Sequence, residues 1–191
     1  MSSYAGIGSR RTPKQFIDKF IEIGEFLALK GITLRSGGAD GADQAFEMGS
    51  DKVTEQAYEW HPEHGKRYNK EIYLPWNGFN DYWNNPDEGI YATPAFINYQ
   101  EARIIAEQHH PYWHNLSEGS RKLHTRNVYQ ILGENLDDPV DLVICWTPDG
   151  KEIGGTSQAL RIANSHGIPI INAGCYTIEI FDNLVKNFKF K

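Results

Sequence analysis

The sequence predicts an α/β fold in which helices cover a mainly parallel β-sheet, and two observations lead to this class. The first 50 residues alternate between short apolar stretches, glycine-rich loops and helical patterns, in the order strand, loop, helix, strand, loop, helix. The segment DLVICWT, residues 141–147, is an almost unbroken apolar run, which is typical of a strand buried on both faces. A strand, loop and helix order then returns towards the C-terminus.

The first helix is the clearest element of the N-terminal half. Thr12 is a good N-cap residue, and Pro13 suits the first helical position. Apolar residues then recur with helical spacing from Phe16 to Leu27, and Gly31 is expected to end the helix. A short apolar strand that includes Tyr4 and Ala5 precedes it.

The second strand and helix follow at once. Residues 32–34 predict a short strand, and SGGADGAD, residues 36–43, is the loop after it. The segment GADQAFEMG predicts a short helix that Gly49 ends. The C-terminal elements are a polar glycine loop at 148–157, a helix at 157–167, a strand at 168–174 and a helix at 177–188.

The middle of the chain, roughly residues 52–137, is less regular and rich in aromatic residues. It carries a plausible strand at 71–76, a helix within 93–110 and a second helix from 120 that ends near Gly133. We interpret it as an aromatic-rich insertion in the same domain, either a lid or a subunit contact.

Composition narrows the function classes. The formal net charge of −6 argues against bulk electrostatic coating of nucleic acid, although it allows a local cationic pocket. No apolar stretch reaches the roughly 18 residues of a membrane helix, and the N-terminus lacks the pattern of a signal peptide. We therefore expect a cytoplasmic protein without a membrane partner. Cys145 and Cys175 lie far apart, so neither a disulfide framework nor a cysteine zinc site is expected.

Three glycine-rich loops carry the functional signal. In an open parallel sheet, loops at the carboxyl ends of the strands hold the ligand, and free N–H groups at helix starts attract phosphate. The hydroxyls of Ser9 and Thr156 and the guanidinium groups of Arg10 and Arg11 add donors. Each loop taken alone has the alternative interpretation of a tight turn. Neither a Walker loop nor a G-x-G-x-x-G is present, which disfavours an ordinary ATPase or NAD dehydrogenase.

Four motifs in order resemble one superfamily. They are SGGADGAD (36–43), RN (126–127), GGTS (154–157) and GIPIINA (167–173). Together they resemble the SLOG superfamily, the Rossmann-like group that includes the DNA-processing protein DprA and the LOG-type nucleotide phosphoribohydrolases. The resemblance implies a single Rossmann-like, doubly wound domain over residues 1–191, and a homo-oligomer.

The resemblance also implies a set of ligand residues, to which Trp146 and Thr147 are added because they end the strand before the third loop. Trp146 is the preferred candidate for stacking on a base. The expected ligand residues are Gly6, Gly8, Ser9, Arg10, Ser36, Gly37, Gly38, Ala39, Asp40, Gly41, Asp43, Arg126, Asn127, Trp146, Thr147, Gly154, Gly155, Thr156 and Ser157.

One departure from the LOG pattern bears on catalysis. LOG enzymes carry a glutamate shortly after the threonine of the third loop, whereas Gln158 and its neighbours offer no carboxylate. Asp43, Glu47 and Arg126 remain as catalytic candidates, with Glu152 as another possible substitute. We therefore expect binding or sensing of a nucleotide or nucleotide-derived phosphate ligand. The alternatives are a nucleotide N-glycosidase and a DprA-like protein that binds single-stranded DNA in recombination.

Histidines, tryptophans and scattered arginines complete the candidates. The pairs His61/His64 and His110/His114 have spacings that metal ligands use, but prolines interrupt both stretches, and neither a metal site nor a cofactor is expected. Four other tryptophans could stack on a base, but most of them are expected to pack in the core or in an interface. They are Trp60, Trp76, Trp83 and Trp113. A local cationic patch could hold a few phosphates; its members are Arg10, Arg11, Arg35, Arg121, Lys122 and Arg126.

Overall fold

The computed structural model describes residues 2–60, 69–152 and 154–191. Within these residues the strands form one six-stranded sheet in the order β4-β3-β2-β1-β5-β6, and every neighbouring pair is parallel. The strands are β1 (Ser3–Gly8), β2 (Thr33–Ser36), β3 (Lys70–Leu74), β4 (Ile90–Ala92), β5 (Leu142–Trp146) and β6 (Ile170–Asn172).

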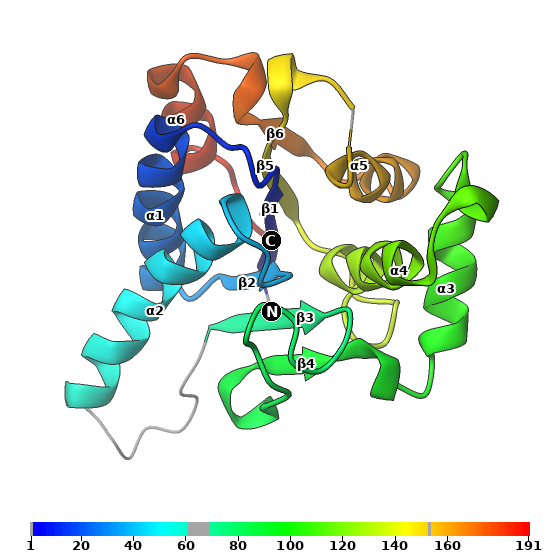
Figure 1. Ribbon diagram of the computed structural model, residues 1–191. Coiled ribbons are helices and arrows are strands. Elements are labelled where there is room, and N and C mark those ends of the chain that lie inside the picture. The colour runs from blue at the N-terminus through cyan, green and yellow to red at the C-terminus, as the bar shows by residue number, and fades with distance from the viewer. Residues whose placement is uncertain (1, 61–68, 153) are drawn as a thin grey trace.

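Helices cover both faces of the sheet, as Figure 1 shows. One face carries α1 (Lys14–Leu29), α2 (Ala42–Trp60) and α6 (Ile178–Lys186). The other carries α3 (Tyr99–Gln108), α4 (Glu118–Leu132) and α5 (Thr156–Ser165). This three-layer, doubly wound arrangement confirms the predicted α/β class with a parallel sheet.

Each face of the sheet has its own aromatic core. Beneath α1, α2 and α6, the rings of Phe20 and Phe46 stack with their centroids 4.3 Å apart, and Phe181 packs edge-on against Phe20. Beneath α3 and α4, Tyr73 and Tyr129 stack at 5.8 Å. Because strands β1 and β5 lie between these two layers, their side chains are buried on both faces.

The strand order reverses between β1 and β5. Strands β2, β3 and β4 extend the sheet from one side of β1, and β5 and β6 extend it from the other. Gly8 at the end of β1 pairs with Trp146 at the end of β5. The loops that leave these two strands diverge to opposite faces, which opens a crevice at the carboxyl edge of the sheet.

Gly49 does not end the second helix, contrary to the sequence prediction. Helix α2 continues through Gly49, where α1 crosses it closely. A Cβ atom at Gly49 would lie 2.1 Å from the carbonyl oxygen of Ile21, and one at Gly24 would lie 2.5 Å from that of Phe46. These glycines let the two backbones approach, so the glycine that sequence reasoning treats as a stop is a packing residue.

Two further expectations change in detail. Pro13, not Thr12, is the N-cap residue of α1, and the Thr12 hydroxyl donates a hydrogen bond to the carbonyl of Ser9 at 2.7 Å. The segment expected as an aromatic-rich insertion carries β3 and β4 of the main sheet and helices α3 and α4. Tyr73 and Tyr129 of this segment therefore belong to the core beneath α3 and α4.

Two global features follow from the described residues. None of the helices in 2–60, 69–152 and 154–191 is long and apolar enough to cross a membrane. Cys145 is buried in β5, Cys175 is exposed, and both are free thiols.

Candidate functional site

A cavity of about 710 Å³ opens at the crevice between β1 and β5. Its walls come from the first and second glycine loops, from one side of α4, and from the third glycine loop with the start of α5. The lining residues are Ile7, Gly8, Ser9, Arg10, Arg11, Ala39, Asp43, Ser120, Leu123, His124, Arg126, Asn127, Gln130, Pro148, Gly154, Gly155, Thr156 and Ala159.

Arg126 occupies a slot that exists because residue 37 is glycine. A Cβ atom at Gly37 would lie 1.1 Å from Nη1 of Arg126 and 2.7 Å from the side-chain amide nitrogen of Gln130. The guanidinium carbon lies 6.0 Å from the centre of the Phe79 ring. Arg126 is only 6% exposed, so the slot fixes a cation at the wall of the cavity.

Asp43 is the acidic partner of this cation. Its Oδ2 lies 3.5 Å from Nη1 of Arg126, and both side chains are buried. Burial raises the pKa of Asp43 to about 6, although Arg126 and the backbone N–H groups of Ala39, Gly8 and Gly37 act in the opposite direction. Burial also lowers the pKa of the Arg126 guanidinium from its ordinary value. Within the described residues Nε of Arg126 has no hydrogen-bond partner, so a buried donor remains beside the cavity.

Asn127 connects α4 to the third glycine loop. Its amide nitrogen donates to the carbonyl of Gly155 at 3.3 Å and to Oε1 of Gln158 at 3.0 Å. Gln158 is fully buried, and its own amide reaches the carbonyl of Ala106 at 3.4 Å. The residue that sequence reasoning treats only as a missing carboxylate is therefore a link between three helices.

His124 lies at the same wall and is held neutral. Burial lowers its pKa to about 4, and a hydrogen bond with Gln158 offsets part of this effect. The His110 ring packs against it with the centroids 4.4 Å apart. A neutral imidazole adds no charge to the cavity near pH 7, so the cationic character there comes from arginine.

The first loop presents two exposed arginines to the cavity. Ser9 shapes this loop, because its Oγ accepts a hydrogen bond from the N–H of Arg11 at 3.1 Å and its carbonyl accepts one from Thr12. Arg10 and Arg11 are exposed and line the cavity. Across from them, the Ser157 hydroxyl donates to the carbonyl of Gly154 at 2.7 Å and shapes the third loop.

The structure brings about half of the predicted ligand residues together. Those that line the cavity are Gly8, Ser9, Arg10, Ala39, Asp43, Arg126, Asn127, Gly154, Gly155 and Thr156. Those that the cavity lining does not include are Gly6, Ser36, Gly37, Gly38, Asp40, Gly41, Trp146, Thr147 and Ser157.

Several of the residues that do not line the cavity hold the loops in place. The Ser36 hydroxyl donates to the carbonyl of Gly6 at 2.6 Å, which ties β2 to β1. Gly41, at a φ of 86°, lets the second loop pass within contact of the Ser9 carbonyl. Asp40 is exposed, and its carboxylate accepts a hydrogen bond from Asn80.

Three other candidates are engaged elsewhere. Glu47 is buried and accepts hydrogen bonds from Lys70 at 2.7 Å and from the Tyr82 hydroxyl at 2.9 Å, so this catalytic candidate is outside the cavity. The Thr147 hydroxyl accepts a hydrogen bond from Asn172. Trp146 is half-buried and packs against the core that includes α1 and α2.

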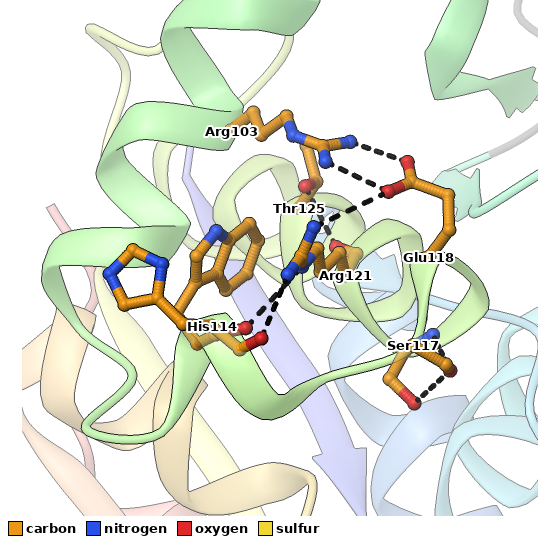
Figure 2. A network of polar contacts seen from close by, with 8 residues as sticks. Arg103, His114, Ser117, Glu118, Arg121 and Thr125 are labelled. Carbon is orange, nitrogen blue, oxygen red and sulfur yellow. Dashed lines mark hydrogen bonds and ion pairs between the residues drawn. The ribbon is translucent and has the colours of Figure 1, made fainter.

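Only part of the expected cationic patch lies at the cavity. Arg35 is buried away from the cavity, where it binds Glu71 at 2.7 Å and the carboxylate of Asp138 at 2.6 Å. Arg121 belongs to the network in Figure 2, in which it donates to the carbonyl of His114 and lies 3.9 Å from Glu118. Arg10, Arg11 and Arg126 are the patch members that line the cavity.

The network in Figure 2 also explains why Trp113 is buried. Glu118 accepts hydrogen bonds from both terminal nitrogens of Arg103. The guanidinium groups of Arg103 and Arg121 each lie 5.9 Å from the centre of the Trp113 ring. The network joins α3, α4 and the turn between them, so Trp113 packs as the sequence predicted.

The histidine pairs do not converge on a metal site in the described part of the chain. His61 and His64 lie outside the described residues, and so does the side chain of Trp60. His114 lies 3.6 Å from Glu107, and His110 packs on His124. Across 2–60, 69–152 and 154–191, no group of three or more His, Cys, Asp or Glu side chains is placed to hold a metal ion.

Sequence reasoning missed the part of the wall that α4 builds beyond its Arg-Asn pair. The additional residues are Ser120, Leu123, His124 and Gln130. Their spacing could have predicted this wall. Residues three and four apart lie on one face of a helix, and this face also includes Asn127.

Comparison with known proteins supports the fold. No protein family model and no curated protein sequence matches this chain. Among solved structures, the fold is similar to that of DNA processing protein A from Helicobacter pylori, with a TM-score of 0.55 and 17% sequence identity. The match covers 98% of this chain and 82% of that chain. The Helicobacter structure concerns a single-stranded DNA binding mode. At this identity the likeness shows a shared fold.

Proposed function

We propose that this protein binds single-stranded DNA and holds a backbone phosphate in the cavity between β1, β5 and α4. The observation that carries the proposal is Arg126, a buried cation with a free donor at the cavity wall. Arg10 and Arg11 line the same cavity and are exposed, so three guanidinium groups surround one space. The similar fold of DNA processing protein A, whose structure concerns single-stranded DNA binding, supports this choice of ligand.

The charge distribution favours binding of a few phosphates rather than a long stretch of backbone. The chain has a formal net charge of −6, so the protein as a whole does not attract a polyanion. The cavity combines three guanidinium groups with residues of three glycine loops. A buried arginine forms strong, directed hydrogen bonds with phosphate. We therefore expect a modest salt dependence of affinity, because few counterions are released.

Fluorescence anisotropy with labelled oligo(dT) tests the proposal. The wild-type protein, Arg10→Ala and Arg11→Ala are titrated at several salt concentrations. Each arginine that contacts a phosphate contributes about 0.7 to the slope of log affinity against log salt, so its removal lowers the slope by about that amount. Lys30→Ala is the matched control, because Lys30 is an exposed cation just after α1, at the opposite edge of the sheet. A wild-type protein that shows no salt-dependent binding overturns the proposal.

A free nucleotide is the second candidate, and the size of the cavity favours it. A volume of about 710 Å³ lies within the range of small-molecule sites, about 300–1,000 Å³. Nucleoside monophosphates that raise the melting temperature, without any binding of oligonucleotides, would identify this ligand class. Asp43 is the one carboxylate among the described lining residues. The N-glycosidase alternative is tested by chromatography, which would detect free base released by the wild type and not by Asp43→Asn.

The expected homo-oligomer stays a prediction that analytical ultracentrifugation tests.

A further inference from the structure

The loop after β3 forms a tight hairpin. Phe79 and Tyr82 form an isolated antiparallel bridge, and the N–H of Tyr82 donates to the carbonyl of Phe79 at 3.0 Å. Asn80 and Asp81 between them have φ values of 53° and 64°. Positive φ at both central positions is the pattern of a type I′ turn, which matches the twist of a hairpin. The loop therefore has a defined shape.

This hairpin is attached to the second glycine loop, whose Ala39 lines the cavity. The Asn80 amide donates to the carbonyl of Gly38 at 3.1 Å and to the Asp40 carboxylate at 3.0 Å, which ties the turn to the second glycine loop. The buried ring of Phe79 faces the Arg126 guanidinium at 6.0 Å. A nucleic-acid strand with a phosphate beside Arg126 would therefore have the hairpin as its neighbour.

Two tryptophans of the hairpin are exposed to solvent. Trp83 is 65% exposed and Trp76 is 36% exposed. The six-membered ring of Trp83 lies against Gly78, where an added Cβ would meet its carbons at 3.4 to 3.7 Å. Trp76 packs edge-on against Phe79, with the ring centroids 5.2 Å apart and an interplanar angle of 88°. Both indoles are thus supported by the hairpin and still present surface to solvent, so little side-chain entropy opposes binding.

We propose that Trp83, assisted by Trp76, forms a stacking platform for a nucleobase of the strand whose phosphate occupies the cavity. This inference rests on the proposed function and adds a base-binding subsite outside the cavity. Every nucleobase has a π face, so the platform selects single-stranded nucleic acid over inorganic phosphate without selecting a sequence. Trp83 replaces Trp146 as the stacking candidate, because Trp146 is half-buried against the core.

The test combines two protein variants with two oligonucleotides. Anisotropy measures the affinity of wild-type protein, Trp83→Ala and Trp83→Phe for intact oligo(dT) and for the same length of abasic deoxyribose phosphate. We expect the wild type to prefer the intact oligonucleotide by about tenfold. Trp83→Ala should lose most of this preference, and Trp83→Phe should keep most of it, because phenylalanine retains an aromatic face. Leu29→Ala is the control, since Leu29 is 66% exposed and is the last residue of α1, at the end of that helix away from the glycine loops.

Each outcome bears on one idea. Binding of intact DNA with no preference over the abasic strand, or a preference that Trp83→Ala leaves unchanged, overturns the platform and leaves the phosphate site standing. Failure of the wild type to bind either strand overturns the proposed function itself. Because the Trp83 side chain is largely exposed, the variants should melt within a few degrees of the wild type, and circular dichroism checks this.

Discussion

Gly37→Ala separates the two roles of the Arg126 slot, binding and stability. Gly37 does not have a positive φ, so alanine fits the backbone there. Its Cβ would lie 1.1 Å from Nη1 and 2.3 Å from Cζ of Arg126, so the guanidinium must leave the slot. We expect affinity for oligo(dT) to fall roughly 10- to 100-fold, the worth of a charge-assisted hydrogen bond of about 1.5–3 kcal/mol. Arg126→Ala should weaken binding by a similar factor.

One part of the effect on stability depends on pH through the titration of Asp43. Its pKa is raised from 3.8 to about 6, which at pH 7 corresponds to about 3 kcal/mol of unfavourable free energy. Arg126 lowers the pKa of Asp43 against the effect of burial, so without Arg126 the carboxyl takes up a proton more readily. The part of the destabilisation that passes through Asp43 should therefore appear at pH 7 and be much smaller near pH 4, where Asp43 is protonated in the folded protein with or without Arg126.

Thermal unfolding followed by circular dichroism at pH 7 and pH 4 measures this difference, beside the anisotropy titration. Gly119→Ala is the matched control, because a Cβ atom at Gly119 meets nothing within 4 Å and alanine favours the first turn of α4. The reasoning is refuted if Gly37→Ala binds oligo(dT) as tightly as the wild type, or if it is equally destabilised at both pH values.

Three further predictions concern the same framework. The pKa of Asp43 is higher in the folded protein than in the unfolded chain, so its contribution to stability is complete below about pH 4 and is lost as the pH rises through about 6. The free energy of unfolding from urea denaturation should therefore fall by about 3 kcal/mol over this range, and Asp43→Asn should remove the fall. Gly49→Ala should destabilise the protein by about 1–3 kcal/mol in urea denaturation although alanine favours helices, because its Cβ meets the Ile21 carbonyl oxygen at 2.1 Å, and a neutral result would contradict the close crossing. Arg35→Ala should reduce stability by about 1–2 kcal/mol, discounted for the partly exposed acids that it binds, and leave affinity for oligo(dT) unchanged; a weaker affinity of the folded variant would return Arg35 to the binding patch.

Local patterns predict most of the sheet and helices. Apolar runs and glycine loops mark β1, β2 and β5, because strands in the middle of a parallel sheet are buried on both faces. The apolar run at residues 168–171 also marks β6, although β6 lies at the edge of the sheet. Strand β4 lies at the edge of the sheet and consists of only three residues, so its apolar run is too short to predict a strand. The length of α2 is hidden because Gly49 looks like a helix end until the position of α1 is known.

The candidate site is less predictable because it depends on contacts between distant segments. Motif order places the three loops at one edge of the sheet, but it does not distinguish Arg126, which lines the cavity, from Arg35, which Asp138 and Glu71 neutralise. Gly37 likewise looks like a ligand contact in the sequence. In the structure it makes room for a side chain from α4.

The central position of β1 has a consequence for how the chain folds during synthesis. One edge of β1 pairs with β2 early in the sequence, whereas the other waits for β5, with Tyr4 opposite Leu142. Until β5 leaves the ribosome, the second edge of an apolar strand has no partner, which is a site for aggregation. Both sides of the crevice depend on that late pairing, so the crevice forms only after β5 has been synthesised. A chain that stops before β5 would then lack the crevice altogether.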